Sequence, residues 1–337
     1  MTLTKPDRIG ETPAKKRHLW TKPIYSSSWG RMYQGDCEKI LGQYPLTRRK
    51  GKVNLILTSP PFPLNRKKKY GNLMGEDYLN WLRNLAPLFR DYLAADGSIV
   101  LELGNAWEPG KPTMSTLPTK ALLAFLEAAE LQLCEEFICY NPARLPSPAQ
   151  WVTVERIRVK DAFTRVWWMS PTERPKANNR HVLTRYSKAM EDLLKRGTYN
   201  SGTRPSEHNI GERSFLVNNG GAIPPNVLIP SFAEEESALT EVIPLANTRT
   251  NDSYQLYCRR TGLACHPARM QEELAAFFVQ FLTDEGDLVL DPFAGSNTTG
   301  SVAQRLRRRW LSIEIDNGYV ASSQVRVKPE LLTELIV

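Results

Sequence analysis

The sequence is poor in the residues that bind metals. It contains five cysteines, an odd number, and four histidines. Neither set has the close pairing of a zinc site, such as two cysteines separated by two residues. The cysteines indicate reduced side chains that pack in the interior of a cytoplasmic protein, and we expect no metal centre. They are Cys37, Cys134, Cys139, Cys258 and Cys265.

Several signatures of other protein classes are also missing. No apolar run approaches the roughly 18 residues needed to span a membrane. Residues 1–16 are polar and charged, which excludes a secretory signal and predicts a flexible tail over residues 1–20. No Gly-Lys-Ser or Gly-Lys-Thr follows a glycine-rich loop, so a P-loop is excluded, and the dinucleotide fingerprint G-x-G-x-x-G is absent.

The composition is that of a globular protein with an uneven distribution of charge. A chain of 337 residues, 41% hydrophobic and 24% charged, is long enough for one large domain with an insertion or for two domains. The formal net charge is +8, and residues 144–230 hold 14 Lys or Arg against 7 Asp or Glu. Nearly all of the excess positive charge lies in this central segment. It suits either a phosphate-binding surface or an ordinary solvated face.

The first informative motif is Ser59-Pro60-Pro61-Phe62, which follows the apolar run of residues 53–57. A short aliphatic run that stops at a double proline predicts a buried parallel strand. At the carboxyl end of such a strand, the Ser59 hydroxyl and the Pro60 carbonyl are hydrogen-bond acceptors, and the Phe62 ring is a flat stacking surface. This arrangement suits a planar base with an exocyclic amino group. The tetrapeptide alone is equally compatible with a polyproline kink in a loop.

The second motif lies near the carboxyl end of the chain. The apolar run of residues 288–290 leads into a loop of small residues, and residues 301–306 then have a helical pattern. A strand, a glycine turn and a helix form the nucleotide-binding unit of α/β folds, because the turn lets a ligand approach the backbone. Glu314 follows Asp291 by 23 residues, near the spacing at which an acidic residue holds ribose hydroxyls.

Together, the two motifs resemble those of the amino-group DNA methyltransferases that use S-adenosylmethionine. The signatures of that family are (D/N/S)-P-P-(Y/F/W) and a loop of the type D-P-F-x-G-S-G-T-T, and their order in this chain is that of the β group. The resemblance covers most of the chain and is greatest to the PvuII-type cytosine-N(4) enzymes. Asn297 stands where glycine is usual, a variant that suits this subgroup, and Ala294 is a smaller departure.

The resemblance implies an enzyme that transfers a methyl group from S-adenosylmethionine to the amino group of a flipped-out cytosine in double-stranded DNA. It assigns catalysis to Ser59, Pro60, Pro61 and Phe62. It assigns cofactor binding to three residues at the ends of other strands, namely Asp36, Cys37 and Thr58, and to Asp291, Pro292, Phe293, Gly295, Ser296, Asn297, Thr298, Thr299 and Glu314.

Alternatives remain open at this point. Serine at position 59 favours cytosine, whereas adenine-N(6) enzymes more often carry Asp or Asn there. A non-catalytic, cofactor-dependent DNA-binding regulator and the methylation of RNA or protein amides are further interpretations. No cysteine directly follows a proline, so the Pro-Cys nucleophile of carbon-5 cytosine methyltransferases is missing. The resemblance implies a cognate restriction endonuclease, and both a monomer and a dimer are compatible with the sequence.

Strands that alternate with helices predict a Rossmann-like α/β fold, with a mostly parallel sheet and helices on both faces. We expect strands near residues 30–37, 53–58, 97–104, 137–142, 163–169, 287–290 and 310–316, and helices near 38–44, 76–93, 117–131, 272–283 and 301–306. The expected divisions are a catalytic part over residues 21–172, a target-recognition region over 173–255, a cofactor-binding part over 256–325 and a C-terminal tail over 326–337.

Two groups of side chains are expected to bind DNA. Arg66, Lys67, Lys68 and Lys69 directly follow the catalytic tetrapeptide, where they suit either the phosphates around an extruded base or a solvated loop. From residue 170 to about 250 the periodicity fades, and a long irregular, basic segment inside an enzyme is usually functional. Within it we expect Arg204 and His208 to contact DNA.

Overall fold

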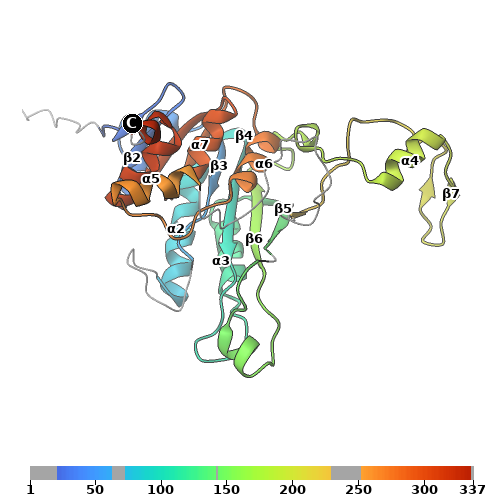
Figure 1. Ribbon diagram of the computed structural model, residues 1–337, viewed down its shortest axis with the longest axis horizontal. Coiled ribbons are helices and arrows are strands. Elements are labelled where there is room, and N and C mark those ends of the chain that lie inside the picture. Colours follow the sequence, from blue (N-terminus) through green and yellow to red (C-terminus); the bar gives the residue numbers. More distant parts are fainter. Residues whose placement is uncertain (1–20, 63–72, 142, 229–251, 335–337) are drawn as a thin grey trace, which may run out of the picture.

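The computed structural model describes residues 21–62, 73–141, 143–228 and 252–334. Its centre is a mostly parallel sheet, to which these residues contribute nine strands in the order β1-β2-β11-β10-β3-β4-β6-β5-β9 (Figure 1). The predicted fold class is confirmed. The strands of this sheet are β1 (Tyr25–Ser26), β2 (Gly30–Gln34), β3 (Val53–Thr58), β4 (Leu93–Gly104), β5 (Gln132–Tyr140), β6 (Phe163–Ser170), β9 (Val227–Leu228), β10 (Leu288–Asp291) and β11 (Arg309–Glu314).

The strand order reverses between β3 and β10. From β10 the chain continues through α7 to β11 on one side of this point, and from β3 it continues through α2 to β4 on the other. The two strands are parallel neighbours, with Leu55 opposite Val289 and Ile56 opposite Leu290. Loops diverge where the order reverses, and the crevice between them is where open α/β sheets bind ligands. The topology thus brings the two sequence motifs to one place.

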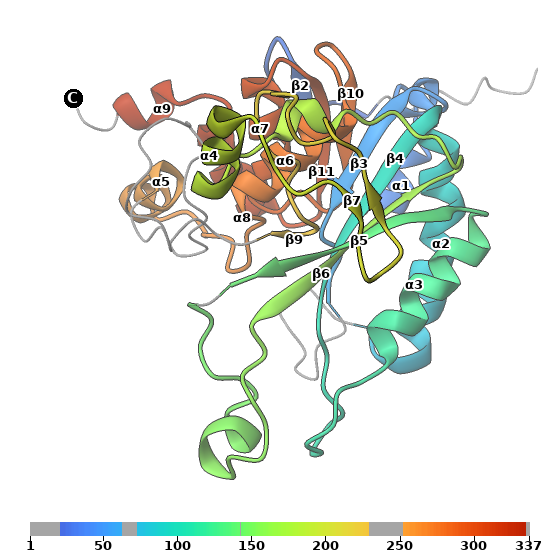
Figure 2. The same cartoon turned by 90° about the vertical axis from the view of Figure 1, so that its right-hand side faces the viewer.

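Helices cover both faces of the sheet, as Figure 2 shows. The helices α1, α2 and α3 pack on the face that carries Ile56 and Leu101, and α6, α7 and α8 pack on the face that carries Leu57 and Val100. Neighbouring residues of one strand serve opposite faces because side chains alternate along a strand. The helices are α1 (Cys37–Leu41), α2 (Gly75–Tyr92), α3 (Leu117–Ala128), α6 (Glu272–Leu282), α7 (Thr298–Arg305), α8 (Asn317–Ser323) and α9 (Glu330–Thr333).

Predicted and observed elements agree best where one face is apolar. The helix expected at residues 76–93 is α2, whose buried side chains recur at the helical period from Tyr78 to Tyr92. The strand expected at residues 97–104 begins earlier, because β4 already pairs with β3 at Leu93. The described residues also form short helical turns, namely η1 (Leu46–Arg49), η2 (Gln150–Val154), η3 (Asn179–Val182) and η5 (Gln324–Arg326).

Some helices lie where the sequence pattern did not predict them. The helix α4 (Lys188–Arg196) follows Ser187, whose hydroxyl accepts a hydrogen bond from Met190 N, and ends at Gly197 with φ 68°. The helix α5 (Ser253–Thr261) is capped in the same way. The expectation of irregular chain over residues 170–250 was wrong for α4. Its side chains are not buried, so capping residues mark its ends while hydrophobic periodicity is lacking.

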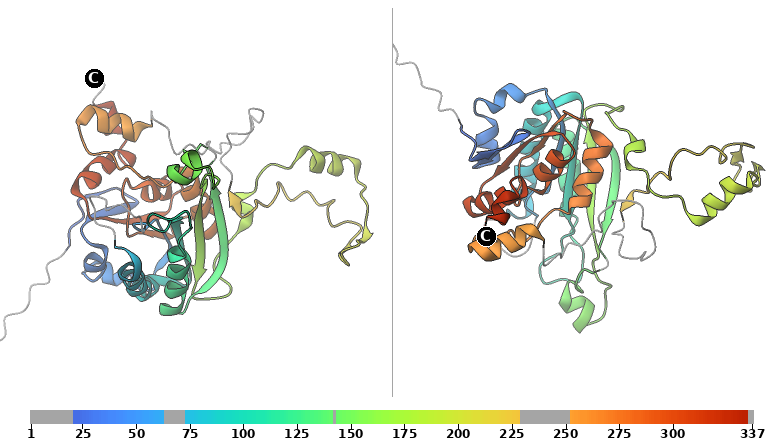
Figure 3. Two further views of the ribbon diagram at one scale, coloured as in Figure 1. Left: turned by 90° about the horizontal axis from the view of Figure 1, so that it is seen from below. Right: turned by 45° about the horizontal axis from the view of Figure 1, so that its top comes forward.

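An arm of residues 183–226 leaves the sheet at the side of β5 (Figures 1 and 3). It carries α4 and a small hairpin of β7 (Gly202–Thr203) and β8 (Asn209–Ile210). Its base is closed by paired backbone hydrogen bonds between Thr184 and Ala222, both 2.9 Å long. The chain then returns to the sheet as β9. None of the helices in the described ranges is long and apolar enough to cross a membrane.

Candidate active site

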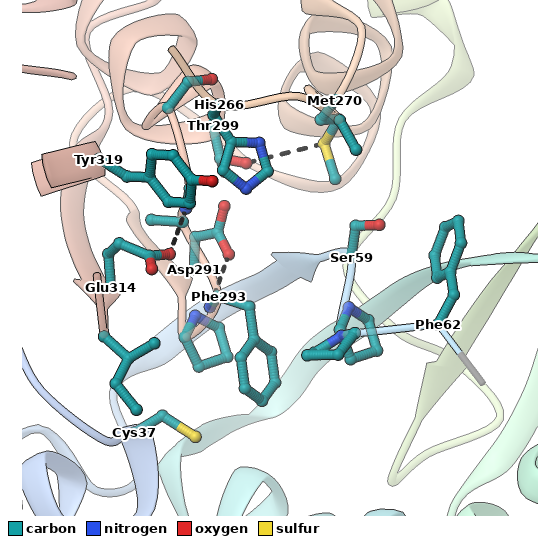
Figure 4. Close-up of a pocket in the computed structure, with 18 of the residues that line it drawn as sticks. Cys37, Ser59, Phe62, His266, Met270, Asp291, Phe293, Thr299, Glu314 and Tyr319 are labelled. Carbon is teal, nitrogen blue, oxygen red and sulfur yellow. Dashed lines mark hydrogen bonds between the residues drawn. The ribbon is translucent and has the colours of Figure 1, made fainter. Parts of the chain in front are cut away.

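A cavity of about 320 Å³ lies at the carboxyl ends of the strands, where the order reverses (Figure 4). This volume lies within the range of small-molecule sites. Most of the residues predicted to bind cofactor or to catalyse lie in its wall. They are Asp36, Cys37, Ser59, Pro60, Pro61, Phe62, Asp291, Pro292, Phe293, Gly295, Ser296, Thr298, Thr299 and Glu314.

Two predicted cofactor residues, Thr58 and Asn297, lie behind the wall. The Thr58 side chain is fully buried, and its hydroxyl donates a 2.6 Å hydrogen bond to Asp291 Oδ1. The same oxygen accepts a hydrogen bond from Phe293 N at 3.1 Å. Thr58 therefore orients the carboxylate that reaches the cavity and does not line the cavity itself.

Asn297 adopts the left-handed conformation, with φ 57°, just before α7. Asparagine tolerates this conformation better than other residues with a side chain. Its buried amide donates to Tyr25 Oη at 3.1 Å and accepts from Ser312 Oγ at 2.7 Å. A Cβ on Gly300 would lie 2.2 Å from the Asn297 Oδ1 atom. The amide fills a polar niche beneath the loop, which explains why asparagine suits a position where glycine is usual.

The glycine loop is held against Glu314 at the end of β11. Gly295 N donates to Glu314 Oε2 at 2.8 Å, and Asp316 N donates to the other carboxylate oxygen, also at 2.8 Å. Gly295 has φ 50°, and a Cβ there would lie 3.0 Å from His266 Nε2. Any other residue would be strained at this position and would press on the histidine ring.

The cavity wall combines buried carboxylates with apolar side chains. The pKa of Asp291 is raised to about 6, chiefly by burial and to a smaller extent by the neighbouring Glu314 carboxylate, although hydrogen bonds from Thr58, Thr299 and Phe293 N lower it. Burial also raises the pKa of Glu314. Burial raises the pKa of the Cys37 thiol to about 12, so this side chain is neutral and adds to the apolar part of the wall, to which Phe293 also belongs. Two buried carboxylates that repel each other favour a cationic ligand.

The loop of the Ser-Pro-Pro-Phe motif, expected to be catalytic, lies between the ends of β3 and β4. Ser59 Oγ donates a long hydrogen bond, 3.4 Å, to the Glu102 carbonyl oxygen. The Phe62 ring lies directly over Gly104, where a Cβ would come within 2.7 Å of two ring carbons. The absence of a side chain at position 104 is thus what lets the Phe62 ring lie against β4.

Sequence patterns missed several residues of the wall. Tyr78 and Trp81 come from α2, His266 and Met270 from the turn before α6, and Tyr319 from α8. The His266 and Tyr319 rings meet edge to face, with centroids 4.5 Å apart. Tyr78 lies at a position of the apolar helical repeat of α2, which is typical of a core residue. Neither His266 nor Tyr319 belongs to either of the two sequence motifs.

The buried Tyr78 hydroxyl indicates that a ligand completes the site. The side chain is 1% exposed, and its oxygen has no hydrogen-bond partner among the described residues. A buried hydroxyl without a partner costs free energy, which a polar ligand atom in the cavity would recover.

In the part of the chain that the structure describes, no group of three or more His, Cys, Asp or Glu side chains is arranged to hold a metal ion.

Of the residues predicted to bind DNA, the structure describes Arg204 and His208, and neither lines the cavity. Arg66, Lys67, Lys68 and Lys69 lie outside the described residues. Arg204 and His208 flank the turn between β7 and β8 on the arm, where Arg204 N donates to the His208 carbonyl oxygen at 2.8 Å. Both side chains are exposed.

The Thr58 hydrogen bond gives a prediction about stability. Replacing Thr58 by Val keeps the shape of the side chain but removes one donor from the buried Asp291 carboxylate. We expect Thr58→Val to lower the free energy of unfolding by about 1–3 kcal/mol. Thr58→Ser keeps the hydroxyl and should lie closer to the wild type. Urea denaturation at pH 8 measures both variants, and equal stability of the two would show that the hydrogen bond contributes nothing.

Comparisons with known proteins agree with this geometry. Residues 53–325 match the profile of a protein family described as DNA methylase, covering N6 and N4 methyltransferases. The type II methyltransferase M.PvuII of Proteus hauseri is 40% identical over 315 residues, which cover 93% of this chain and 88% of that protein.

Solved structures show the same relationship. The PvuII DNA methyltransferase (cytosine-N4-specific) superimposes with a TM-score of 0.69 and 35% identity over 94% of both chains. TTHA0409 of Thermus thermophilus, solved with S-adenosyl-L-methionine, shares the fold at 16% identity, with a TM-score of 0.51 over 90% of this chain and 94% of that chain. The chain belongs to the DNA methylase family of amino methyltransferases.

Proposed function

We propose that the protein is a site-specific DNA methyltransferase that modifies the exocyclic amino group of cytosine, with S-adenosylmethionine as methyl donor. The observation that carries this proposal is the junction of a Ser-Pro-Pro-Phe loop and an acidic glycine loop in one cavity. The PvuII methyltransferase, which is similar to this chain in sequence and in structure and whose solved structure is described as cytosine-N4-specific, supports the choice of base.

The residues of the cavity fit the cofactor. Asp291 and Glu314 would face its cationic and hydroxyl groups, and Cys37 and Phe293 would flank its adenine. When bound, S-adenosylmethionine supplies an electrophilic methyl group on a positively charged sulfur. The acidic wall favours a ligand of that charge, and the φ of Gly295 lets the backbone approach it closely.

Catalysis by the Ser59 loop rests on position and hydrogen bonding. The Ser59 hydroxyl proton points to the Glu102 carbonyl oxygen, so its lone pairs are free to accept a proton of the amino group. The Pro60 carbonyl would accept the second amino proton. Both bonds favour a pyramidal nitrogen, whose lone pair is then released from the ring for in-line attack. Serine is too weak a base to ionise the amino group first, so the proton leaves during or after transfer.

The target base must leave the duplex to reach this loop. The cavity lies within the carboxyl edge of the sheet, and a paired base cannot approach it closely enough for reaction. The Phe62 ring, fixed over Gly104, would stack on the extruded base. We propose that residues 173–255 form the target-recognition region, between a catalytic part over 21–172 and a cofactor-binding part over 256–325.

The biological setting follows from the type II relative. We propose that methylation protects DNA from a cognate restriction endonuclease, which need not bind this protein. Because the substrate is cellular DNA, the proposed location is the cytoplasm.

We propose that the phosphates near the extruded base are held by Arg66, Lys67, Lys68 and Lys69. The duplex would also be contacted from the arm by Arg204 and His208.

Methyl transfer to plasmid DNA tests the proposed function. Unmodified plasmid is incubated with labelled S-adenosylmethionine, digested to nucleosides and analysed by mass spectrometry. We expect N(4)-methylcytosine. N(6)-methyladenine would overturn the choice of base, and no transfer to any DNA would overturn the function.

In the same assay, Ser59→Ala should lower turnover about 100-fold or more while cofactor affinity changes little. Equal loss of both would contradict the role of Ser59.

Cofactor binding should depend on pH. The pKa of Asp291 is about 6 without ligand, so the carboxylate is ionised at pH 8 and protonated at pH 5. A cationic ligand binds the ionised form better, so affinity should be steady from pH 7 to 8 and fall about tenfold per pH unit below pH 6. Titration calorimetry from pH 5 to 8 measures this. Asp291→Asn should bind more weakly and show a flatter pH dependence, and a flat wild-type profile would contradict the argument.

The arm residues should affect DNA binding but not cofactor binding. For the double variant Arg204→Ala/His208→Ala, we expect weaker binding to the duplex. The slope of log binding constant against log salt concentration should also become shallower by about one unit. Fluorescence anisotropy at several salt concentrations measures both quantities. Arg90→Ala, an exposed cation on α2, is the matched control. An unchanged affinity and slope in the arm variant would remove these two residues from the DNA interface.

A further inference from the structure

A second projection, the hairpin tip of residues 143–161, extends from the catalytic edge of the sheet. It joins β5 to β6 and lies below the sheet in Figure 1, apart from the arm that carries α4. Backbone hydrogen bonds give it a definite shape. Ile157 N and Arg158 N donate to the Trp151 carbonyl oxygen at 2.9 and 3.2 Å, and Asp161 N donates to the Ser147 carbonyl oxygen at 3.0 Å.

The hairpin tip presents apolar side chains to solvent. Leu145 is 81% exposed, Val154 68%, Ile157 48% and Val159 87%. Single exposed apolar residues are normal on a protein surface, but a group of four on one ordered projection is unusual and indicates a contact surface. Arg158 Nε ties the hairpin tip to the loop after β4 by a 2.8 Å hydrogen bond to the Pro112 carbonyl oxygen.

Cations accompany the apolar side chains. The hairpin tip contains four Lys or Arg and two Asp or Glu, and Ile157 and Val159 are placed between Arg156, Arg158 and Lys160 in the sequence. A surface that is apolar and positively charged suits a partner that has both stacked apolar planes and negative charge. Duplex DNA has both, since phosphates flank the stacked bases. A second copy of this basic chain would bring like charges together.

The root of the hairpin tip lies beside the catalytic loop. Ser59 contacts the Glu102 carbonyl oxygen, and the Phe62 ring lies over Gly104. The next residue, Asn105, donates through Nδ2 to Asp161 Oδ1 at 2.8 Å and to the Phe163 carbonyl oxygen at 3.3 Å. The end of β4 therefore touches the catalytic loop on one side and the base of the hairpin tip on the other.

We propose that the hairpin tip is a wedge, whose apolar side chains enter the duplex beside the target base and fill the space that the flipped base leaves. The proposal rests on the proposed function, because only a base taken out of the stack leaves such a space. Apolar side chains between base steps offset the cost of unstacking, and the cations hold the adjacent phosphates. The arm and the hairpin tip then have different tasks, since the arm contacts the duplex away from the catalytic loop.

The test compares an ordinary duplex with one in which no base pairs with the target. Both carry the site mapped in the plasmid experiment, and in the second duplex an abasic position lies opposite the target cytosine. We expect Val154→Ala/Val159→Ala to methylate the ordinary duplex about 10- to 100-fold more slowly than the wild type. On the second duplex, where extrusion costs little, the variant should recover to within about threefold of the wild type.

Controls separate the wedge from a general loss of activity and from an effect on assembly. Leu123→Ala, on α3, removes a similar side chain that is 59% exposed and should methylate both duplexes like the wild type. Equal loss on both duplexes by the tip variant would overturn the wedge, as would a wild-type dimer that becomes a monomer in the variant by analytical ultracentrifugation. Failure of the proposed function is distinguishable, because the wild type itself would then methylate neither duplex.

Discussion

The hydrogen bond from Thr58 to Asp291 joins the two halves of the active site. It connects the ends of β3 and β10, which are far apart in the sequence and adjacent in the sheet. Because both side chains are buried, few other hydrogen-bond donors can reach the Asp291 carboxylate. The position of the catalytic loop is thereby coupled to that of the glycine loop. Small shifts between these loops would matter, since methyl transfer requires an in-line approach.

Burial of charge makes the same place suited to its ligand. Asp291 and Glu314 lie in the wall of one cavity, and burial raises the pKa of both. Without a ligand the site holds repelling carboxylates, and the Tyr78 hydroxyl, which no described residue pairs, adds a further cost. A cationic cofactor with several polar groups would relieve both. Cofactor binding would thus remove an electrostatic cost that the folded protein carries without the ligand.

The two projections depend on the sheet in a different way. Both the arm and the hairpin tip are shaped by local backbone hydrogen bonds and have few buried side chains. A rigid sheet places them, and their exposed surfaces remain available for a large partner. Arg204 on the arm and Val159 on the hairpin tip illustrate the two kinds of surface, one polar and one apolar. A duplex has phosphates for the first and base stacks for the second.

The sequence by itself determined the fold class and placed the Ser-Pro-Pro-Phe motif and the glycine loop at the ends of strands. Each of these depends on neighbouring residues, such as an apolar run that stops at Pro60 or a small-residue turn after Asp291. Tertiary structure alone decided which other side chains complete the site. Tyr78 occupies a position of the apolar helical repeat, as a core residue does. Tyr319 lies in a short helix that the sequence pattern did not predict. Contacts between distant segments depend on how strands are ordered in the sheet, and local sequence periodicity does not contain that order.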